Sequence, residues 1–178
     1  MINALKNIAL LSGLLLLAAC APLPLTNPHF ATPTRSPKQL ENWTVKGTII
    51  INTEEDSSHA RFNWHQQGQN YTIDFFGPLG TYHQHIEGSP HSVSLIDPQN
   101  HLTQAPTPEA LLQQTLGWRL PVRALIYWIR GLPTPAAGWQ VEYGDYTVVE
   151  GYKLPQTLTL TYPELQVKIR INRWEINA

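Results

Sequence analysis

The sequence predicts a mainly β domain, in which an antiparallel sheet curls into a barrel or half-barrel with short helices as a plug or lid. Apolar and polar residues alternate with a period of two over most of the chain from Trp43 onward, as in strands that bury one face of a sheet. Residues 107–131 break this alternation with helical spacing. Few helical residues are therefore available to cover a long apolar face, which favours a curled sheet.

Each expected strand carries its own alternation. On the first strand, Trp43, Val45, Gly47, Ile49 and Ile51 fall on one face. The later strands cover residues 60–65, 71–75, 82–86, 92–95, 139–143, 158–162, 165–171 and 174–176. The last of these segments has the opposite parity to the one before it, which predicts a bulge or twist near Asn172. These segments indicate about nine or ten antiparallel strands.

Two or three short helices are expected beside the strands. Thr107-Pro108-Glu109 is a typical helix start, and Gly117 is a typical stop. A second helix opens at Pro121 and closes at Gly131, and its amphipathic face holds Val122, Leu125, Ile126 and Ile129. Ser36-Pro37-Lys38-Gln39 predicts a further helix of a turn or two, with Ser36 as its N-cap.

Length and charge limit the possible functions. The chain has 178 residues, which is typical of one domain, and its formal net charge is −1. A nucleic-acid-binding protein would normally show a basic patch or a high isoelectric point, so we expect no nucleic-acid partner. The single cysteine rules out an intramolecular disulfide and any zinc or iron–sulfur site built from cysteines.

Residues 1–19 are expected to be a lipoprotein signal peptide. The apolar run from Ile8 to Leu17 is too short to span a bilayer. Leu17-Ala18-Ala19-Cys20 resembles the bacterial lipobox, which predicts cleavage before Cys20 and lipid attachment to its thiol. A plain signal peptide with an incidental cysteine is the alternative. Two or three acyl chains would anchor the protein firmly, whereas one chain would not.

A tether and a single domain follow the lipidated cysteine. Residues 20–38 hold five of the fifteen prolines and have little periodicity, which predicts an extended spacer. Residues 39–178 form the domain. Lipoproteins kept at the inner membrane often carry Asp after the cysteine, so Ala21 points by resemblance to the outer membrane, on the side that faces the periplasm of a Gram-negative bacterium.

The sequence offers little catalytic chemistry, and we expect neither an enzyme nor a cofactor. It contains no G-x-S-x-G elbow and no G-x-x-x-x-G-K-[ST] phosphate loop. His83 and His85 share one face of a strand, and His59 and His65 could join them in a metal site. That face is opposite to Tyr82 and Ile86, so a solvated histidine face without metal is the favoured interpretation. A zinc site, or a lipid-active hydrolase using His83 or His85, is the alternative.

The hairpin Gly77-Pro78-Leu79-Gly80 is unusual. Proline suits the second position of a turn and glycine supplies a positive φ, but leucine contributes nothing to turn formation. Leu79 either folds back onto the sheet or forms an exposed apolar tip that touches a membrane or a partner. The pattern alone leaves both interpretations open.

Several segments, in order, resemble the LolB family of outer-membrane lipoprotein receptors, and they span nearly the whole mature chain. They are the lipobox, Trp43-x-x-x-Gly47, Ala60-Arg61-Phe62-x-Trp64, Tyr71 through Gly77-Pro78-Leu79-Gly80, Gly117-Trp118-x-Leu120-Pro121-Val122, Leu125-x-x-Trp128-x-x-Gly131-Leu132-Pro133, Trp139-x-Val141-x-Tyr143, Leu154-Pro155 and Val167 to Trp174. The resemblance implies an open, incomplete antiparallel β-barrel of about nine to eleven strands, with two or three short helices as lid or plug over an apolar cavity.

The resemblance also implies a role in lipoprotein localisation. The cavity would take the acyl chains of a lipoprotein delivered by the periplasmic carrier LolA, and the receptor, expected to be a monomer, would release this cargo into the inner leaflet of the outer membrane without ATP. The match assigns a membrane-targeting loop to Pro78, Leu79 and Gly80. Our candidates for the cavity lining are Phe62, Trp64, Ile73, Phe75, Leu125 and Ile129, each of which could equally be packed core.

One departure from the family concerns the connection between Pro133 and Trp139. Only Thr134 to Gly138 separate them, where the family usually has room for another strand. A smaller sheet or a wider cavity mouth is therefore expected. The alternative function is a lipid-anchored periplasmic binding protein for another apolar ligand.

Overall fold

The structure is a computed structural model that describes residues 32–116 and 120–177. The expected signal peptide, Cys20, the tether up to Ala31 and the helix stop at Gly117 lie outside the described residues. Residues 31–178 form one compact unit. Within the described ranges, no helix has both the length and the apolar character needed to cross a membrane.

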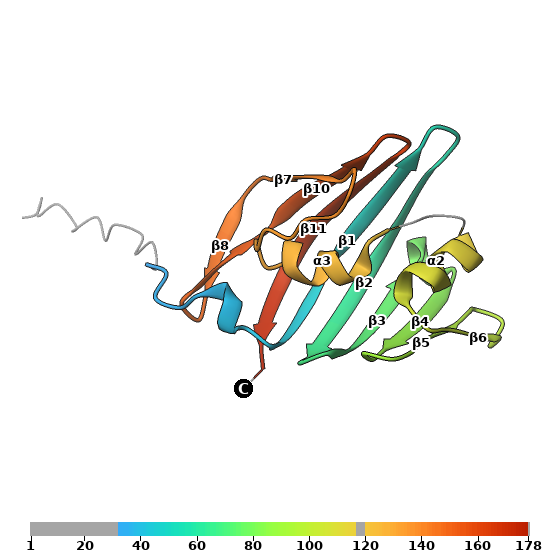
Figure 1. The fold of residues 1–178 in the computed structure, drawn as a ribbon, viewed down its shortest axis with the longest axis horizontal. Helices are drawn as coiled ribbons and strands as arrows, with labels where there is room; N and C mark the ends of the chain where they lie inside the picture. Colours follow the sequence, from blue (N-terminus) through green and yellow to red (C-terminus); the bar gives the residue numbers. More distant parts are fainter. Residues whose placement is uncertain (1–31, 117–119, 178) are drawn as a thin grey trace, which may run out of the picture. The chain divides into compact units, whose positions relative to one another are not determined.

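Strands dominate the described residues (Figure 1). They are β1 (Asn42–Thr53), β2 (Ser57–Gln67), β3 (Asn70–Phe76), β4 (His83–Gly88), β5 (Val93–Ile96), β6 (Leu102–Ala105), β7 (Gln140–Tyr143), β8 (Tyr146–Val149), β9 (Tyr152–Pro155), β10 (Thr157–Tyr162) and β11 (Leu165–Ile176). The helices are the 3₁₀ turns η1 (Pro37–Gln39) and η2 (Pro78–Gly80) and the α-helices α2 (Pro108–Leu116) and α3 (Val122–Trp128).

Nine of these strands form one antiparallel sheet, in the order β6-β5-β4-β3-β2-β1-β11-β10-β7. The sheet is open, because β6 and β7 lie at its two edges and do not pair with each other in the described residues. β8 and β9 form a separate two-stranded sheet. The predicted class is confirmed: the protein is mainly β, with an open antiparallel sheet and two α-helices.

Side chains on the two faces of the sheet differ as the alternation predicted. Along β2, Ala60, Phe62 and Trp64 are buried, while Arg61 and His65 are exposed. We call the apolar side the inner face and the polar side the outer face. Both α-helices lie on one side of the sheet (Figure 1), and their buried residues belong to the same core cluster as the inner face.

The predicted irregularity near Asn172 is confirmed. Lys46 pairs with Arg173 and Gly47 with Ile171, so Asn172 is an extra residue on β11. This bulge keeps Ile171 and Trp174 on the same face although they are three residues apart. The Trp174 ring packs on Trp43 at 5.6 Å between centroids.

The helix signals are also confirmed in the described residues. The Oγ1 of Thr107 accepts a hydrogen bond from the Ala110 backbone N–H at 3.1 Å, as an N-cap does. Val122, Leu125 and Ile129 are buried, and Ile126 is half-buried, so the amphipathic face packs as predicted. Gly131 follows α3 with a φ of +76° and closes the turn by donating to the Trp128 carbonyl.

The residues before β1 pack against the domain. Ser36 caps the single 3₁₀ turn η1 by accepting from the Lys38 N–H at 3.4 Å. The N–H groups of Thr34 and Arg35 both donate to the Gly151 carbonyl, at 2.9 and 3.0 Å. The Arg35 guanidinium lies 4.5 Å from the centre of the Tyr152 ring. The packed unit thus includes the last residues of the predicted spacer.

Candidate functional site

The six candidate cavity residues all belong to one apolar cluster on the inner face. β2 and β3 supply four of them and α3 and the turn after it supply two, namely Phe62, Trp64, Ile73, Phe75, Leu125 and Ile129. Five are buried as core, and Phe75 is half-buried and lines an open hollow. Their role in binding a ligand stays a prediction.

The hollow beside Phe75 lies at the end of the inner face that is nearest the β3–β4 hairpin. It has a volume of about 370 Å³, and its apolar lining is Ile49, Ile51, Ala60, Phe75, Tyr82 and Pro98. Ser58, His59 and Gln84 add a polar rim. Ligand sites typically have volumes of about 300–1,000 Å³ and mostly apolar walls. We call this feature the apolar hollow.

A second hollow, of about 740 Å³, lies at the opposite end of β1–β3, between η1 and α3. Its lining is mixed, with Leu40, Trp43, Tyr71, Ile126 and Tyr127 beside the cations of Lys38, Arg123 and Arg130. Burial, reinforced by the nearby Glu109, raises the pKa of the Tyr71 phenol, which Arg123 opposes. The phenol therefore stays protonated at physiological pH and can only serve as a neutral group.

Arg130 is buried and ties α3 to the start of β1. Its guanidinium donates to the Leu40 carbonyl at 2.6 Å and to the Ile126 carbonyl at 3.1 Å. It also lies 5.2 Å from the centre of the Tyr127 ring. Burial lowers the pKa of this guanidinium, while Tyr127 and Glu41 raise it. Sequence reasoning missed this residue, because nothing in a lone arginine shows that it reaches a backbone carbonyl of another segment, here that of Leu40.

The β3–β4 hairpin presents Leu79 to solvent. The Gly77 N–H donates to the Tyr82 carbonyl at 3.0 Å, and the Gly80 N–H donates to the Gly77 carbonyl at 3.1 Å. Leu79 has a φ of +54°, and its side chain is fully exposed, at 102% of the reference area. The structure thus shows Leu79 as an exposed apolar tip, and its contact with a membrane or a partner stays a prediction.

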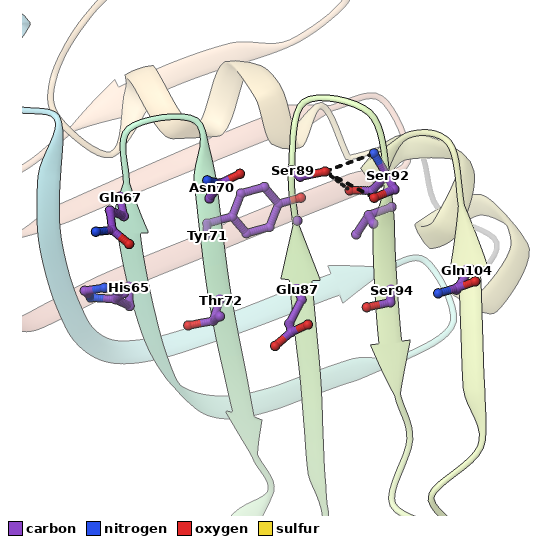
Figure 2. A pocket seen from close by; sticks show the side chains of 12 residues that line it. His65, Gln67, Asn70, Tyr71, Thr72, Glu87, Ser89, Ser92, Ser94 and Gln104 are labelled. Atoms are coloured by element: carbon purple, nitrogen blue, oxygen red, sulfur yellow. Dashed lines mark hydrogen bonds between the residues drawn. The ribbon is translucent and has the colours of Figure 1, made fainter.

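Polar side chains cover the outer face. Figure 2 shows His65, Gln67, Thr72, Glu87, Ser94 and Gln104 standing on neighbouring strands around a hollow of about 430 Å³. The Tyr71 ring crosses from β3 toward Ser89, whose hydroxyl lies 3.1 Å from that of Ser92. The lining of this hollow is mostly polar, unlike that of the apolar hollow.

His83 and His85 lie on this outer face, as predicted, and the structure adds Asp74 between them. The Oδ1 of Asp74 lies 2.8 Å from His83 Nε2 and 2.8 Å from His85 Nδ1. The hydrogen bond with Asp74 is the main cause of a raised His85 pKa, against the opposing effect of burial. Burial alone would raise the pKa of Asp74, but hydrogen bonds from His85 and His83 leave it below its ordinary value. His59 and His65 are not part of this group.

An open antiparallel sheet whose apolar face is partly covered by two α-helices defines the structural class of this domain. The chain belongs to one family within this class. The sequence profile of the family described as outer membrane lipoprotein LolB matches residues 41–138 and 134–174. The two matched segments meet at the short connection after Pro133. Membership confirms the outer-membrane, lipid-anchored localisation expected from the sequence.

Individual relatives carry the same description. The outer-membrane lipoprotein LolB of Aeromonas hydrophila is 34% identical over 186 residues, which cover 93% of this chain and 94% of the relative. That of Coxiella burnetii is 36% identical over 155 residues, which cover 77% of this chain and 73% of the relative. That of Chromohalobacter salexigens is 34% identical, over 77% of this chain and 72% of the relative.

A solved structure supports the fold alone. The crystal structure of a DUF1329 family protein from Desulfovibrio piger superposes with a TM-score of 0.53, over 80% of this chain and 88% of that protein. The two sequences are only 6% identical. The likeness therefore concerns the arrangement of strands and carries no information about the site.

Proposed function

We propose that the protein is a monomeric receptor that accepts acylated lipoproteins from a soluble LolA-like carrier and inserts them into the inner leaflet of the outer membrane without ATP. The observation that carries this proposal is the apolar hollow beside an exposed apolar tip. The family to which the chain belongs is one of outer-membrane lipoproteins, which supports it. No bond is made or broken in such a transfer, so the protein needs no catalytic residue and no cofactor.

The apolar hollow supplies the binding step. The transfer of an acyl chain out of water is favourable by about 0.8 kcal/mol of free energy for each buried CH₂ group. The side chains of Ile49 and Ile51 and the ring of Phe75 offer apolar walls for such a chain. The receptor must also release its cargo, and an open sheet exposes the bound chain more than a closed cavity would.

The exposed tip supplies the release step. Leu79 lies at the end of the hairpin that borders the apolar hollow, and its side chain contacts water rather than the sheet. Inserted into a bilayer, this side chain would bring the hollow close to the membrane surface. Without ATP, cargo moves only if its affinity rises from carrier to receptor to bilayer.

The test measures the transfer of lipoprotein cargo to a variant in which a bulky side chain fills the apolar hollow. The chain from Ala21 onward lacks the lipid and contains the whole compact unit of residues 31–178. Ser58 is an exposed residue at the rim of the apolar hollow, and Ser57 is its exposed neighbour on the opposite face of β2. We expect Ser58→Trp to reduce the uptake of an acylated lipoprotein from loaded LolA, and Ser57→Trp to leave it unchanged.

The outcomes separate the two candidate functions. The receptor function is supported if the parent chain and Ser57→Trp take up lipoprotein and Ser58→Trp takes up less. If no lipoprotein moves to the parent chain, yet a fluorescent fatty-acid probe binds and Ser58→Trp prevents this, the proposed receptor function is wrong and a carrier for another apolar ligand remains. Equal loss in both variants would contradict a site in the apolar hollow.

Delivery is tested separately from uptake. We expect Leu79→Glu to accept cargo but to fail to pass it to liposomes, because a charged tip does not enter the bilayer. Leu102, another exposed leucine, lies on the edge strand β6 and gives the matched control Leu102→Glu. Liposome flotation measures the delivered cargo. Equal delivery by Leu79→Glu and Leu102→Glu would contradict the proposed role of the tip.

A further inference from the structure

We propose that Asp74, His83 and His85 form a binding site for a divalent transition-metal ion on the outer face of the β3–β4 hairpin. This inference does not depend on the proposed receptor function. The two histidines alone favoured a solvated face, but the sheet register adds a carboxylate to them.

The pairing of β3 with β4 brings the three donors together. Asp74 pairs directly with His85, and His83 lies two residues before His85 on the same face of β4. Asp74 Oδ1, His83 Nε2 and His85 Nδ1 all lie within 4.8 Å of one another. One carboxylate oxygen and two imidazole nitrogens are a donor set that zinc and related ions bind, with positions left for water.

Neighbouring side chains hold the two imidazoles in place. The Phe76 ring stacks on His83, with 4.9 Å between centroids and 8° between the planes. On the other histidine, Nε2 lies 3.4 Å from Glu87 Oε1 while Nδ1 faces Asp74. A carboxylate on the far nitrogen of a metal-binding histidine orients the ring and makes it a better ligand. Asp74 and Glu87 also bring negative charge to the site.

A side chain beside Asp74 on the outer face has a buried oxygen that accepts no hydrogen bond from the described residues. Asn63 on β2 pairs directly with Asp74 and therefore lies on the same face. Its Oδ1 is buried and has no hydrogen-bond partner among the described residues. A metal-bound water is a strong hydrogen-bond donor, and it would suit this Asn63 oxygen as its acceptor.

The site is also open to solvent. The side chains of Asp74 and His85 are 24% and 27% exposed, and that of His83 is 53% exposed. A hollow of about 520 Å³ lies beside both histidines, between Gly80–Thr81 and Ile96–Asn100. An ion can therefore enter, and there is room for the waters that complete its coordination.

The donor atoms need only a small adjustment. Zinc binds nitrogen and oxygen at about 2.0–2.2 Å, so neighbouring donors in a tetrahedral site lie about 3.3–3.5 Å apart. The present contacts of 2.8 Å are hydrogen bonds, and they lengthen by roughly half an ångström when an ion replaces the protons. A bound ion would join β3 to β4 and stiffen the hairpin that carries Leu79.

The experiment is a calorimetric titration of the chain from Ala21 onward with ZnCl₂, after EDTA treatment and without a histidine tag. The matched control is His101, whose Nδ1 lies 3.1 Å from Asp97 Oδ2 in a pair that lacks a second histidine. We expect one zinc ion to bind. Asp74→Asn and His83→Gln should each raise Kd by about 10-fold or more, and Glu87→Gln by about 10-fold. His101→Gln should leave Kd unchanged.

Two further readouts keep the result free of folding artefacts. His83 is half-exposed, so His83→Gln leaves the core intact, and circular dichroism checks this. Zinc should raise the melting temperature of the parent chain and of His101→Gln, but not that of Asp74→Asn. Absence of saturable zinc binding by the parent chain would overturn the proposal. Binding that survives Asp74→Asn and His83→Gln unchanged would overturn it equally.

Discussion

At position 79 a leucine occupies the left-handed region, with φ of +54° and ψ of 18°. This conformation costs a residue with a Cβ about 1–2 kcal/mol, and glycine avoids the cost. The side chain makes no compensating contact with the sheet, because it is fully exposed. A turn optimised for stability alone would not carry leucine here, which fits a residue kept for what it contacts outside the molecule.

Leu79→Gly separates stability from membrane binding. Relief of the left-handed strain is partly offset by the greater freedom of glycine in the unfolded chain, so we expect the unfolding free energy to change by less than about 1 kcal/mol. Association with liposomes should nevertheless fall. Urea unfolding and flotation measure the two quantities. Undiminished flotation of the glycine variant would show that the leucine side chain does not contact the membrane.

A second prediction at the scale of single residues concerns Arg130. Its replacement by methionine keeps much of the apolar stem but leaves the buried Leu40 carbonyl without its charged donor. We expect Arg130→Met to lower the unfolding free energy by about 2 kcal/mol. Arg173, which is exposed and pairs with Glu175 at 3.0 Å, is the control. Arg173→Met should cost under about 1 kcal/mol, and equal losses would contradict the bridging role of Arg130.

At the scale of elements, the pairing of β1 with β11 depends on Gly47. A Cβ added there would overlap the Arg170 carbonyl oxygen and lie 2.9 Å from the Phe62 ring. The backbone oxygen cannot move without disturbing the ladder beside the bulge. We expect Gly47→Ala to lower the unfolding free energy by about 2 kcal/mol or more. Thr48→Ala, the adjacent position, should cost less, and the reverse order would contradict this packing.

The long elements could be predicted from the sequence because each repeats its signal several times. β1, β2 and β11 show four or more alternations, and the change of parity before Trp174 located the bulge. Strands of four residues offer little repetition. Alternation still predicts β5 and β7, but β6, β8 and β9 are not identified individually, and only tertiary pairing defines them.

The candidate site was predictable only in part, for a related reason. Alternation assigned Phe62, Ile73 and Phe75 to the inner face, because that property is local. The position of Asp74 between two histidines depends on the register of β3 with β4, and the reach of Arg130 depends on where α3 docks. Such contacts join two distant segments, and the residue pattern within one segment carries no information about the other.

For the whole molecule, the two faces of one open sheet differ in chemistry. The inner face carries the aromatic core and the apolar hollow, and the outer face carries the polar side chains and the Asp74, His83 and His85 cluster. The β3–β4 hairpin borders both faces and ends at Leu79. We therefore expect lipid to bind to the inner face alone.

The most direct test is photocrosslinking by a lipoprotein whose acyl chain carries a diazirine. The lipoprotein is transferred from LolA to the chain from Ala21 onward, irradiated, and the crosslinked residues are located by mass spectrometry. We expect crosslinks at Ile49, Ile51, Ala60 and Phe75, which line the apolar hollow. Crosslinks confined to outer-face residues such as Ile96 and Leu102 would contradict it.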